Sequence, residues 1–325
     1  MSVRILEGDA LTVLRTLPDQ SVQCCVTSPP YFGLRDYCVV GQLGLEKTPQ
    51  LYVDAMVGVF REVRRVLRDD ATLWLNIGDS YAGSWAGNSM RPEGGAQRDG
   101  KPGFQPLSDG RYSARGGRTY GLKPKDLMGI PWMLAFALRA DGWYLRSDII
   151  WHKPNPMPES VTDRPTKSHE FLFLLTKSPT YFYDADAIAE ACNPEQFAHN
   201  LRYAKEYTAH TESAENRQPG NVNSVGIHAR AAKITRNKRS VWSVSTTPYS
   251  DAHFATFPPK LIEPCILAGS AKGDTVLDPF GGAGTTGLVA DRLGRNATLI
   301  ELNTKYAAMA RKRISGDNPL FTDVA

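Results

Sequence analysis

The pattern of hydrophobic and polar positions predicts short apolar strands that alternate with amphipathic helices. Apolar residues recur at helical spacing over residues 51–67, while arginines and glutamates take the opposite positions. Residues 71–77 then form an almost continuous apolar run, typical of a buried strand, which Gly78-Asp79 ends. Such alternation predicts an α/β fold, with a mostly parallel sheet covered by helices.

The remaining elements are expected on the same grounds. Strands are expected at residues 4–6, 22–26, 144–151, 170–176, 275–278 and 297–302, and helices at 10–17, 127–140, 259–268, 285–293 and 305–314. Two stretches lack such periodicity. We expect glycine-rich residues 82–125 to form a long mobile basic loop, and the polar residues 184–240 to form a separate small module.

Composition places the chain among globular proteins. Of its 325 residues, 42% are hydrophobic, more than a disordered chain carries. No apolar run approaches the roughly 18–20 residues of a membrane span, and the N-terminal residues lack signal-peptide anatomy. The 5 cysteines show no C-x-x-C spacing, which argues against a zinc site or a disulfide framework. We therefore expect a cytoplasmic protein without a bound metal.

The formal net charge of +4 is mild but unevenly distributed. Residues 193–240 hold 8 Lys and Arg against 4 Asp and Glu, and the glycine-rich loop is also basic. A polyanion such as a nucleic acid would suit both segments. Basic loops that are merely solvated have the same composition, so charge alone leaves both interpretations open.

A glycine-rich turn near the C-terminus predicts a nucleotide-cofactor site. Gly282-Ala-Gly-Thr-Thr-Gly287 follows an expected strand and precedes an expected helix, and Glu301 lies at the end of the next strand. Glycines let backbone amides approach an anionic group at a helix N-terminus, and an acid about 20 residues on can bind ribose hydroxyls. A dinucleotide-binding dehydrogenase shares this pattern.

Two details favour S-adenosylmethionine (SAM) over a dinucleotide. Asp278-Pro279-Phe280 separates the strand from the glycines, and the Asp278 carboxylate could hold an ammonium group, which a nicotinamide dinucleotide lacks. Only 38 residues follow Gly287, too few for a second nucleotide-binding half and a substrate domain. The ammonium of SAM would then meet Asp278, its carboxylate the loop amides, and its ribose Glu301.

A second candidate site follows an expected strand near the N-terminus, where the chain runs Thr27-Ser28-Pro29-Pro30-Tyr31. Consecutive prolines fix two φ angles and push Ser28 toward an extended conformation, so this turn is stiff. The Ser28 hydroxyl and the Pro29 carbonyl can accept hydrogen bonds from an exocyclic amino group, and Tyr31 offers a face for stacking. Such a site implies base flipping, whereas an ordinary Pro-Pro turn is the alternative. Both sites together suggest methyl transfer to a nucleobase.

These segments resemble the SAM-dependent DNA methyltransferases that modify exocyclic amines, in the β group whose catalytic motif precedes the cofactor motif. The (Asp/Asn/Ser)-Pro-Pro-(Tyr/Phe) signature of that family falls on Ser28-Pro29-Pro30-Tyr31, and its Phe-x-Gly-x-Gly motif on Phe280-Gly-Gly-Ala-Gly284. Its N-terminal Gly-Asp, whose acid meets the adenine amino group, falls on Gly8-Asp9. Residues 149–155 and 165–170 resemble its pocket-wall strands, and 253–258 its helix-entry motif.

The resemblance implies a Rossmann-like seven-stranded SAM-dependent methyltransferase fold, circularly permuted, with a small target-recognition insert. Residues 1–184 would form the catalytic half of the methyltransferase domain, 185–240 the target-recognition region, and 241–325 the cofactor-binding half. The implied catalytic residues are Ser28, Pro29, Pro30 and Tyr31. The implied cofactor-binding residues are Asp9, Ala10, Thr27, Phe257, Asp278, Pro279, Phe280, Gly281, Gly282, Gly284, Thr285, Thr286, Glu301, Leu302 and Asn303. The implied DNA-contacting residues are Arg202, Arg230, Lys233, Arg236, Lys238 and Arg239.

In this family Ser-Pro-Pro-Tyr usually accompanies methylation of cytosine N4, and Asp-Pro-Pro-Tyr that of adenine N6. Ser28 therefore indicates an N4-cytosine methyltransferase acting on double-stranded DNA, with N6-adenine as the alternative. Methylation at carbon 5 requires a thiolate, but Cys265 lies inside an expected apolar helix, where a core cysteine is the simpler interpretation. An RNA methyltransferase and a catalytically silent DNA-binding protein stay open. The resemblance is compatible with a monomer or a homodimer and with a separate restriction endonuclease.

Overall fold

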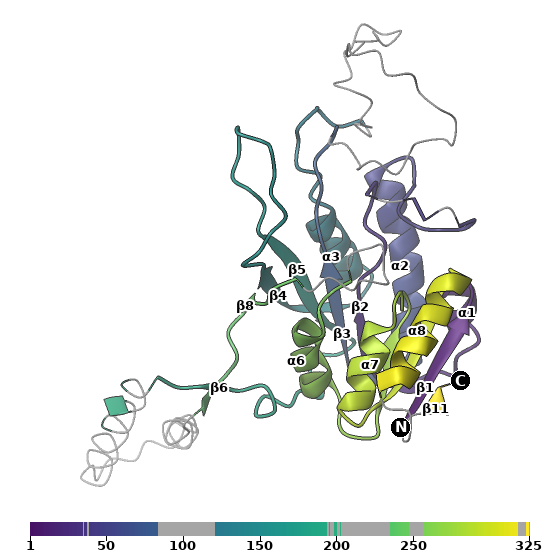
Figure 1. Ribbon diagram of the computed structural model, residues 1–325, viewed down its shortest axis with the longest axis vertical. Helices are drawn as coiled ribbons and strands as arrows, with labels where there is room; N and C mark the ends of the chain where they lie inside the picture. Colours follow the sequence, from purple (N-terminus) through teal and green to yellow (C-terminus); the bar gives the residue numbers. More distant parts are fainter. Residues whose placement is uncertain are drawn as a thin grey trace, which may run out of the picture. The chain divides into compact units, whose positions relative to one another are not determined.

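The computed structural model describes residues 1–83, 121–193, 235–246, 256–317 and 323–324, except Arg35 and Cys38, together with residues 195, 198, 199 and 202. The chain divides into two compact units, one made of Met1–Tyr183 and Ser240–Ala325 and the other of Asp184–Arg239. The larger unit consists of one extended sheet between two groups of helices (Figure 1). Both of its chain segments contribute strands to this sheet.

Within the described residues, nine strands form the sheet, in the order β11-β1-β10-β9-β2-β3-β5-β4-β8. Their bounds are β1 Ser2–Glu7, β2 Val22–Thr27, β3 Leu67–Ile77, β4 Tyr144–His152, β5 His169–Thr176, β8 Val241–Ser243, β9 Thr275–Asp278, β10 Asn296–Glu301 and β11 Asp323–Val324. The short strands β11 and β8 lie at the two edges and leave the seven main strands that were expected. Because β10 and β9 lie between β1 and β2, the circularly permuted topology is confirmed.

Strand direction gathers many loops at one edge of the sheet. Strands β1, β10, β9, β2 and β3 run parallel, so the segments that follow them leave from the same side. Strand β5 is antiparallel to both β3 and β4, which brings the beginning of β5 and the end of β4 to that side as well. In open α/β sheets, ligands bind outside the carboxyl ends of the strands.

Helices cover both faces of the sheet (Figure 1). Their bounds are α1 Ala10–Leu14, α2 Pro49–Val66, α3 Ile130–Ala140, α6 Pro259–Gly269, α7 Thr285–Arg292 and α8 Thr304–Asp317. Helices α1, α2 and α3 pack in one group and α6, α7 and α8 in the other. Helix α2 buries Tyr52, Met56 and Phe60 completely, and its start is capped by Thr48, whose hydroxyl accepts a hydrogen bond from the Leu51 amide at 3.2 Å.

Several element boundaries differ from the expected ones. Helix α1 ends at Leu14 rather than at residue 17, and β3 begins at Leu67 rather than at residue 71. Helix α3 begins at Ile130 rather than at residue 127, because Gly129 adopts the left-handed φ of 73° and stops the helix from extending upstream. Asp79, just after β3, caps α3 by accepting hydrogen bonds from the Gly129 and Ile130 amides at 3.0 and 3.1 Å.

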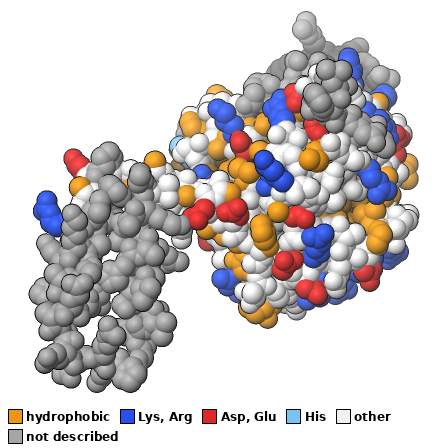
Figure 2. All heavy atoms as spheres, turned by 90° about the horizontal axis from the view of Figure 1, so that it is seen from below, with side chains coloured by type: hydrophobic (Ala, Val, Ile, Leu, Met, Phe, Trp, Pro, Cys, Tyr) orange, Lys and Arg blue, Asp and Glu red, His pale blue; other side chains and the backbone are white. Residues whose placement is uncertain are grey.

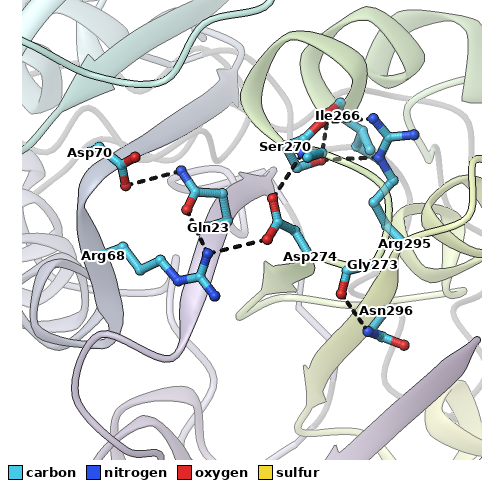
Figure 3. Close-up of polar contacts among 10 residues, drawn as sticks. Gln23, Arg68, Asp70, Ile266, Ser270, Gly273, Asp274, Arg295 and Asn296 are labelled. Atoms are coloured by element: carbon cyan, nitrogen blue, oxygen red, sulfur yellow. Dashed lines mark hydrogen bonds and ion pairs between the residues drawn. The ribbon is translucent and has the colours of Figure 1, made fainter.

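A polar network at the amino ends of the strands joins the two segments of the larger unit (Figure 3). Arg68 on β3 donates to Asp274, just before β9, at 3.2 Å. Arg295, just before β10, is only 6% exposed and donates to the carbonyls of Ser270 at 2.7 Å and Leu293 at 2.6 Å. These contacts hold α6, β9 and β10 against the N-terminal strands, on the edge of the sheet opposite the carboxyl ends.

The smaller unit, Asp184–Arg239, holds a short antiparallel pair between β6 (Glu190–Ala191) and β7 (Thr235–Arg236). Glu190 is surrounded by three cations: Arg239 at 3.0 Å, Arg236 at 3.5 Å and Lys238 at 3.9 Å. Arg202, another expected DNA-contacting residue, is exposed. Arg230, Lys233 and residues 84–120 of the expected basic loop lie outside the described residues.

Basic and acidic side chains are interspersed on the face of the larger unit that Figure 2 shows. Exposed ion pairs on this unit include Arg61 with Asp141 and Arg292 with Asp317. Among the described helices, none is long and apolar enough to cross a bilayer.

Candidate active site

A cavity of about 600 Å³ opens where the parallel strands end. Segments that follow β1, β2, β9 and β10 line it, together with residues at the ends of β3 and β4 and at the beginning of β5. The two candidate sites, which begin at Ser28 and Asp278, therefore share one cavity. Their strands are direct neighbours, with Cys25 of β2 opposite Leu277 of β9.

The turn after β9 is held against the end of β10. The Gly281 amide donates to the Ile300 carbonyl at 2.8 Å, and the Gly282 amide donates to Glu301 Oε2 at 2.8 Å. The Asn303 amide donates to Glu301 Oε1, also at 2.8 Å, so backbone amides hold both carboxylate oxygens. Burial raises the pKa of Glu301, although these hydrogen bonds oppose the rise. Glu301 thus stands in the cavity wall, where a ribose-binding acid was expected.

Asp278 links the two candidate sites. Its carboxylate is 1% exposed and accepts hydrogen bonds from the Thr27 hydroxyl at 2.6 Å, the Thr286 hydroxyl at 2.6 Å and the Phe280 amide at 3.0 Å. Burial raises its pKa to about 6, and the three hydrogen bonds limit the rise. Protein donors thus occupy most of this carboxylate, and its contact with the ammonium group of a cofactor stays a prediction.

The other expected cofactor residues fall into two groups. Those that line the cavity are Asp9, Ala10, Phe257, Pro279, Phe280, Gly281, Gly282, Thr285, Leu302 and Asn303. Thr27, Gly284 and Thr286 are not part of the lining. The two threonines are fully buried and bind Asp278, and Gly284 begins α7 with a φ of 77°, where a Cβ would approach an α8 side chain to 2.8 Å. These three residues therefore support the lining of the cavity without being part of it.

All four residues of the Ser-Pro-Pro-Tyr turn line the cavity. Ser28 is half-buried and Pro29 is buried. The Tyr52 hydroxyl donates to the Pro30 carbonyl at 2.9 Å, whereas no donor among the described residues reaches the Pro29 carbonyl. Because buried carbonyls rarely lack a partner, the Pro29 carbonyl is suited to accept a hydrogen bond from a bound ligand.

None of the sequence patterns singled out a polar cluster beside this turn, although its segments were assigned to the pocket wall. The Tyr31 hydroxyl donates to Glu170 Oε2 at 2.6 Å and lies 3.3 Å from Asn76 Oδ1. Lys153 pairs with the other Glu170 oxygen and lies 4.3 Å from the centre of the Trp151 ring. Burial, followed by the adjacent Glu170, raises the pKa of Tyr31 well above its ordinary value. The sequence did contain a signal for this cluster: Lys153 follows the apolar strand β4, and Glu170 lies at the start of the apolar strand β5.

Comparisons with known proteins agree with this geometry. Residues 22–312 match the N6/N4 methyltransferase family of DNA methylases. The chain belongs to this family. M.XycI, a type II methyltransferase of Xanthomonas campestris pv. cyanopsidis, is 49% identical over 314 residues, which cover 97% of this chain and 88% of the relative.

Solved structures share the fold. A putative DNA modification methylase of Thermus thermophilus, TTHA0409, in complex with SAM, is 25% identical and superimposes with a TM-score of 0.57 over 99% of both chains. The cytosine-N4-specific PvuII DNA methyltransferase is 18% identical and gives a TM-score of 0.62 over 98% of this chain and 89% of its own.

The enzyme is therefore a SAM-dependent DNA methyltransferase, and the dehydrogenase alternative is excluded. The cavity suits the cofactor: its volume of about 600 Å³ lies within the range of about 300–1,000 Å³ for small-molecule sites. Glu301, the amides of the glycine turn and the Phe280 ring supply acid, donors and an apolar surface in one place. Cys265 is fully buried in α6, as expected of a core cysteine.

Proposed function

We propose that the enzyme transfers a methyl group from SAM to the exocyclic N4 amine of a cytosine flipped out of double-stranded DNA. The observation that carries the proposal is the pair of acceptors, the Ser28 hydroxyl and the Pro29 carbonyl, in the wall of the same cavity as Glu301. An exocyclic amine has two N–H bonds, one for each acceptor. Adenine N6 presents the same two donors and is the second candidate.

The residues of the turn prepare the amine for reaction. The lone pair of the exocyclic nitrogen is delocalised into the base and is a poor nucleophile. Hydrogen bonds to Ser28 and Pro29 would draw the two N–H bonds toward tetrahedral geometry and free that lone pair. Bound SAM supplies a methyl group activated by its sulfonium. The protein therefore acts mainly by alignment, and no covalent enzyme intermediate is needed.

We assign target recognition to the smaller unit, Asp184–Arg239. Arg236, Lys238 and Arg239 lie close together around Glu190, and the sequence of residues 193–240 holds 8 Lys and Arg against 4 Asp and Glu, a net positive charge that suits DNA phosphates. The similarity to a type II methyltransferase supports a role in modifying one DNA sequence and so protecting it from a companion endonuclease. A base stacked in a duplex reaches an enclosed cavity only when it is flipped out.

The reaction product tests the proposal. Purified enzyme is incubated with isotopically labelled SAM and unmethylated bacterial DNA, and the DNA is digested to nucleosides for mass spectrometry. We expect the label in N4-methylcytosine. Label in N6-methyladenine alone would overturn the choice of base, and label in neither amine would overturn the proposed reaction.

Ser28→Ala tests the role of the turn. We expect it to lower the single-turnover rate about 100-fold, in the range seen when one oriented hydrogen-bonding group is lost, while the Kd for DNA changes little. Methyl transfer is followed by rapid quench and DNA binding by fluorescence anisotropy. An unchanged rate would contradict the assigned role of Ser28.

A further inference from the structure

A partly buried carboxylate holds the tyrosine of the Ser-Pro-Pro-Tyr turn. Glu170, near the beginning of β5, has a side chain that is 15% exposed. Its Oε2 accepts the Tyr31 hydroxyl at 2.6 Å and the Asn76 side-chain amide at 3.3 Å. Asn76 also donates to the Phe171 carbonyl at 3.1 Å, so neighbouring groups of β3 and β5 fix the carboxylate.

Lys153 forms an ion pair with this carboxylate. Its ammonium group pairs with Glu170 Oε1, is 19% exposed, and is itself held over the Trp151 ring. Ion pairs with this degree of burial carry a desolvation cost and add little net stability. The pair fixes the carboxylate that accepts the Tyr31 hydroxyl, and hydrogen bonds to carboxylates are roughly twice as strong as those between neutral groups.

The Tyr31 ring is fixed at a second point. Its Cε2 atom lies so near Gly78 that a Cβ at that glycine would be 2.6 Å away. The edge of the Tyr31 ring therefore packs against the Gly78 backbone, while its hydroxyl donates to Glu170. A ring held at both points keeps one orientation in the cavity wall, next to Ser28 and Pro29.

We propose that Glu170, paired with Lys153, is a positioning residue that fixes Tyr31 against the flipped base and so keeps the target amine aligned with Ser28 and Pro29. The proposal rests on the function assigned above to the Ser-Pro-Pro-Tyr turn. In this proposal Glu170 acts through Tyr31. The predicted consequence is energetic coupling between the two side chains in the methyl-transfer step.

A double-mutant cycle tests this coupling, with Glu170→Gln, Tyr31→Phe and the combined variant. Total labelled methyl transfer to DNA in a single turnover is the readout, so the identity of the base does not affect it. We expect each single variant to be slower by about 10- to 100-fold, the scale of a small misplacement of reacting groups. The combined variant should be no slower than Tyr31→Phe, because Glu170 then has no tyrosine hydroxyl to hold.

Two results would overturn the proposal: a wild-type rate in Glu170→Gln, or losses that multiply in the combined variant. The Kd for SAM should stay unchanged, which separates a positioning effect from damage to the cofactor site. If Glu170→Gln does not fold, Lys153→Met replaces it in the same cycle and should show the same coupling to Tyr31.

Matched controls separate this proposal from the assigned function. Asp141→Asn breaks an ion pair with the exposed Arg61 on the larger unit, outside the cavity, and should leave the rate unchanged. If Ser28→Ala transfers methyl slowly while Glu170→Gln transfers it at the wild-type rate, only the role proposed for Glu170 is wrong. A fast Ser28→Ala would remove the assigned function of the turn itself.

Discussion

Asp278 joins parts of the site that carry different tasks. It ends β9, and its carboxylate accepts hydrogen bonds from Thr27 of β2 and Thr286 of α7. The segment after β2 holds the acceptors for the target base, and the segment after β9 holds the glycine turn of the cofactor site. One buried side chain therefore sets the distance between the two halves of the reaction.

The same burial makes Asp278 a source of pH-dependent stability. The unfolded chain releases its proton near the ordinary pKa of 3.8, whereas the folded protein keeps it until about pH 6. Between these values the folded state binds more protons, so stability decreases as pH rises. The stabilisation is fully present below pH 3.8 and lost above about pH 6. It amounts to about 3 kcal/mol, because each unit of pKa difference corresponds to roughly 1.4 kcal/mol.

Urea unfolding of the ligand-free protein and of Asp278→Asn, from about pH 3.5 to about pH 7, measures this contribution. The difference between their unfolding free energies should shrink with rising pH, because the variant does not titrate at this position. A difference that is independent of pH would contradict the elevated pKa.

Single residues differ in how far the sequence reveals their roles. The stiffness of the Ser-Pro-Pro-Tyr turn was predictable, because the proline ring fixes φ whatever surrounds it. The partner of Tyr31 was not, because Glu170 lies 139 positions away and reaches it only through the antiparallel placement of β5. Thr27 and Thr286 were expected to bind the cofactor, but they bind Asp278 and do not line the cavity.

At the scale of elements, periodicity predicted every main strand and the helices that cover them, while the exact ends depended on tertiary contacts. Helix α3 starts where Asp79, just after β3, accepts hydrogen bonds from its first amides. The sequence around residue 130 cannot predict this start, because Asp79 is about 50 residues away. The amino ends of the strands show the same dependence. There, Arg295 fastens β10 to the segment that follows α6.

Arg295→Leu should lower the free energy of unfolding by about 2–4 kcal/mol, because it leaves the Ser270 and Leu293 carbonyls without a charged donor. Arg292→Leu is the matched control: it removes a pair whose arginine is 51% exposed and should cost about 0–1 kcal/mol. Chemical denaturation of both variants gives the comparison. Equal losses in the two variants would contradict the structural role of Arg295.

At the scale of the whole molecule, the order of motifs along the chain was the informative feature. A catalytic motif that precedes the cofactor motif implied a permuted sheet, and the strand order agrees. Composition marked out the smaller unit but gave none of its contacts, since the convergence of three cations on Glu190 depends on the pairing of β6 with β7.

Replacing Arg236, Lys238 and Arg239 together by Gln should weaken DNA binding and flatten its salt dependence. Each lost phosphate contact should reduce the slope of log Kd against log salt by about 0.9. Fluorescence anisotropy over a series of salt concentrations measures the slope, and SAM binding without DNA serves as the control for folding. A triple variant with the wild-type slope would remove these residues from the DNA interface.

The position of β9 and β10 between β1 and β2 also has a consequence for protein synthesis. A ribosome makes β1 and β2 within the first 27 residues but does not reach β9 until residue 275. Throughout that interval β2 can pair with β3, but the two strands that connect β1 to β2 in the sheet are missing, and the cavity lacks its cofactor wall. A chain terminated before residue 275 therefore lacks the cofactor side of the cavity and cannot methylate DNA, and activity cannot appear during translation until β9 and β10 have been made.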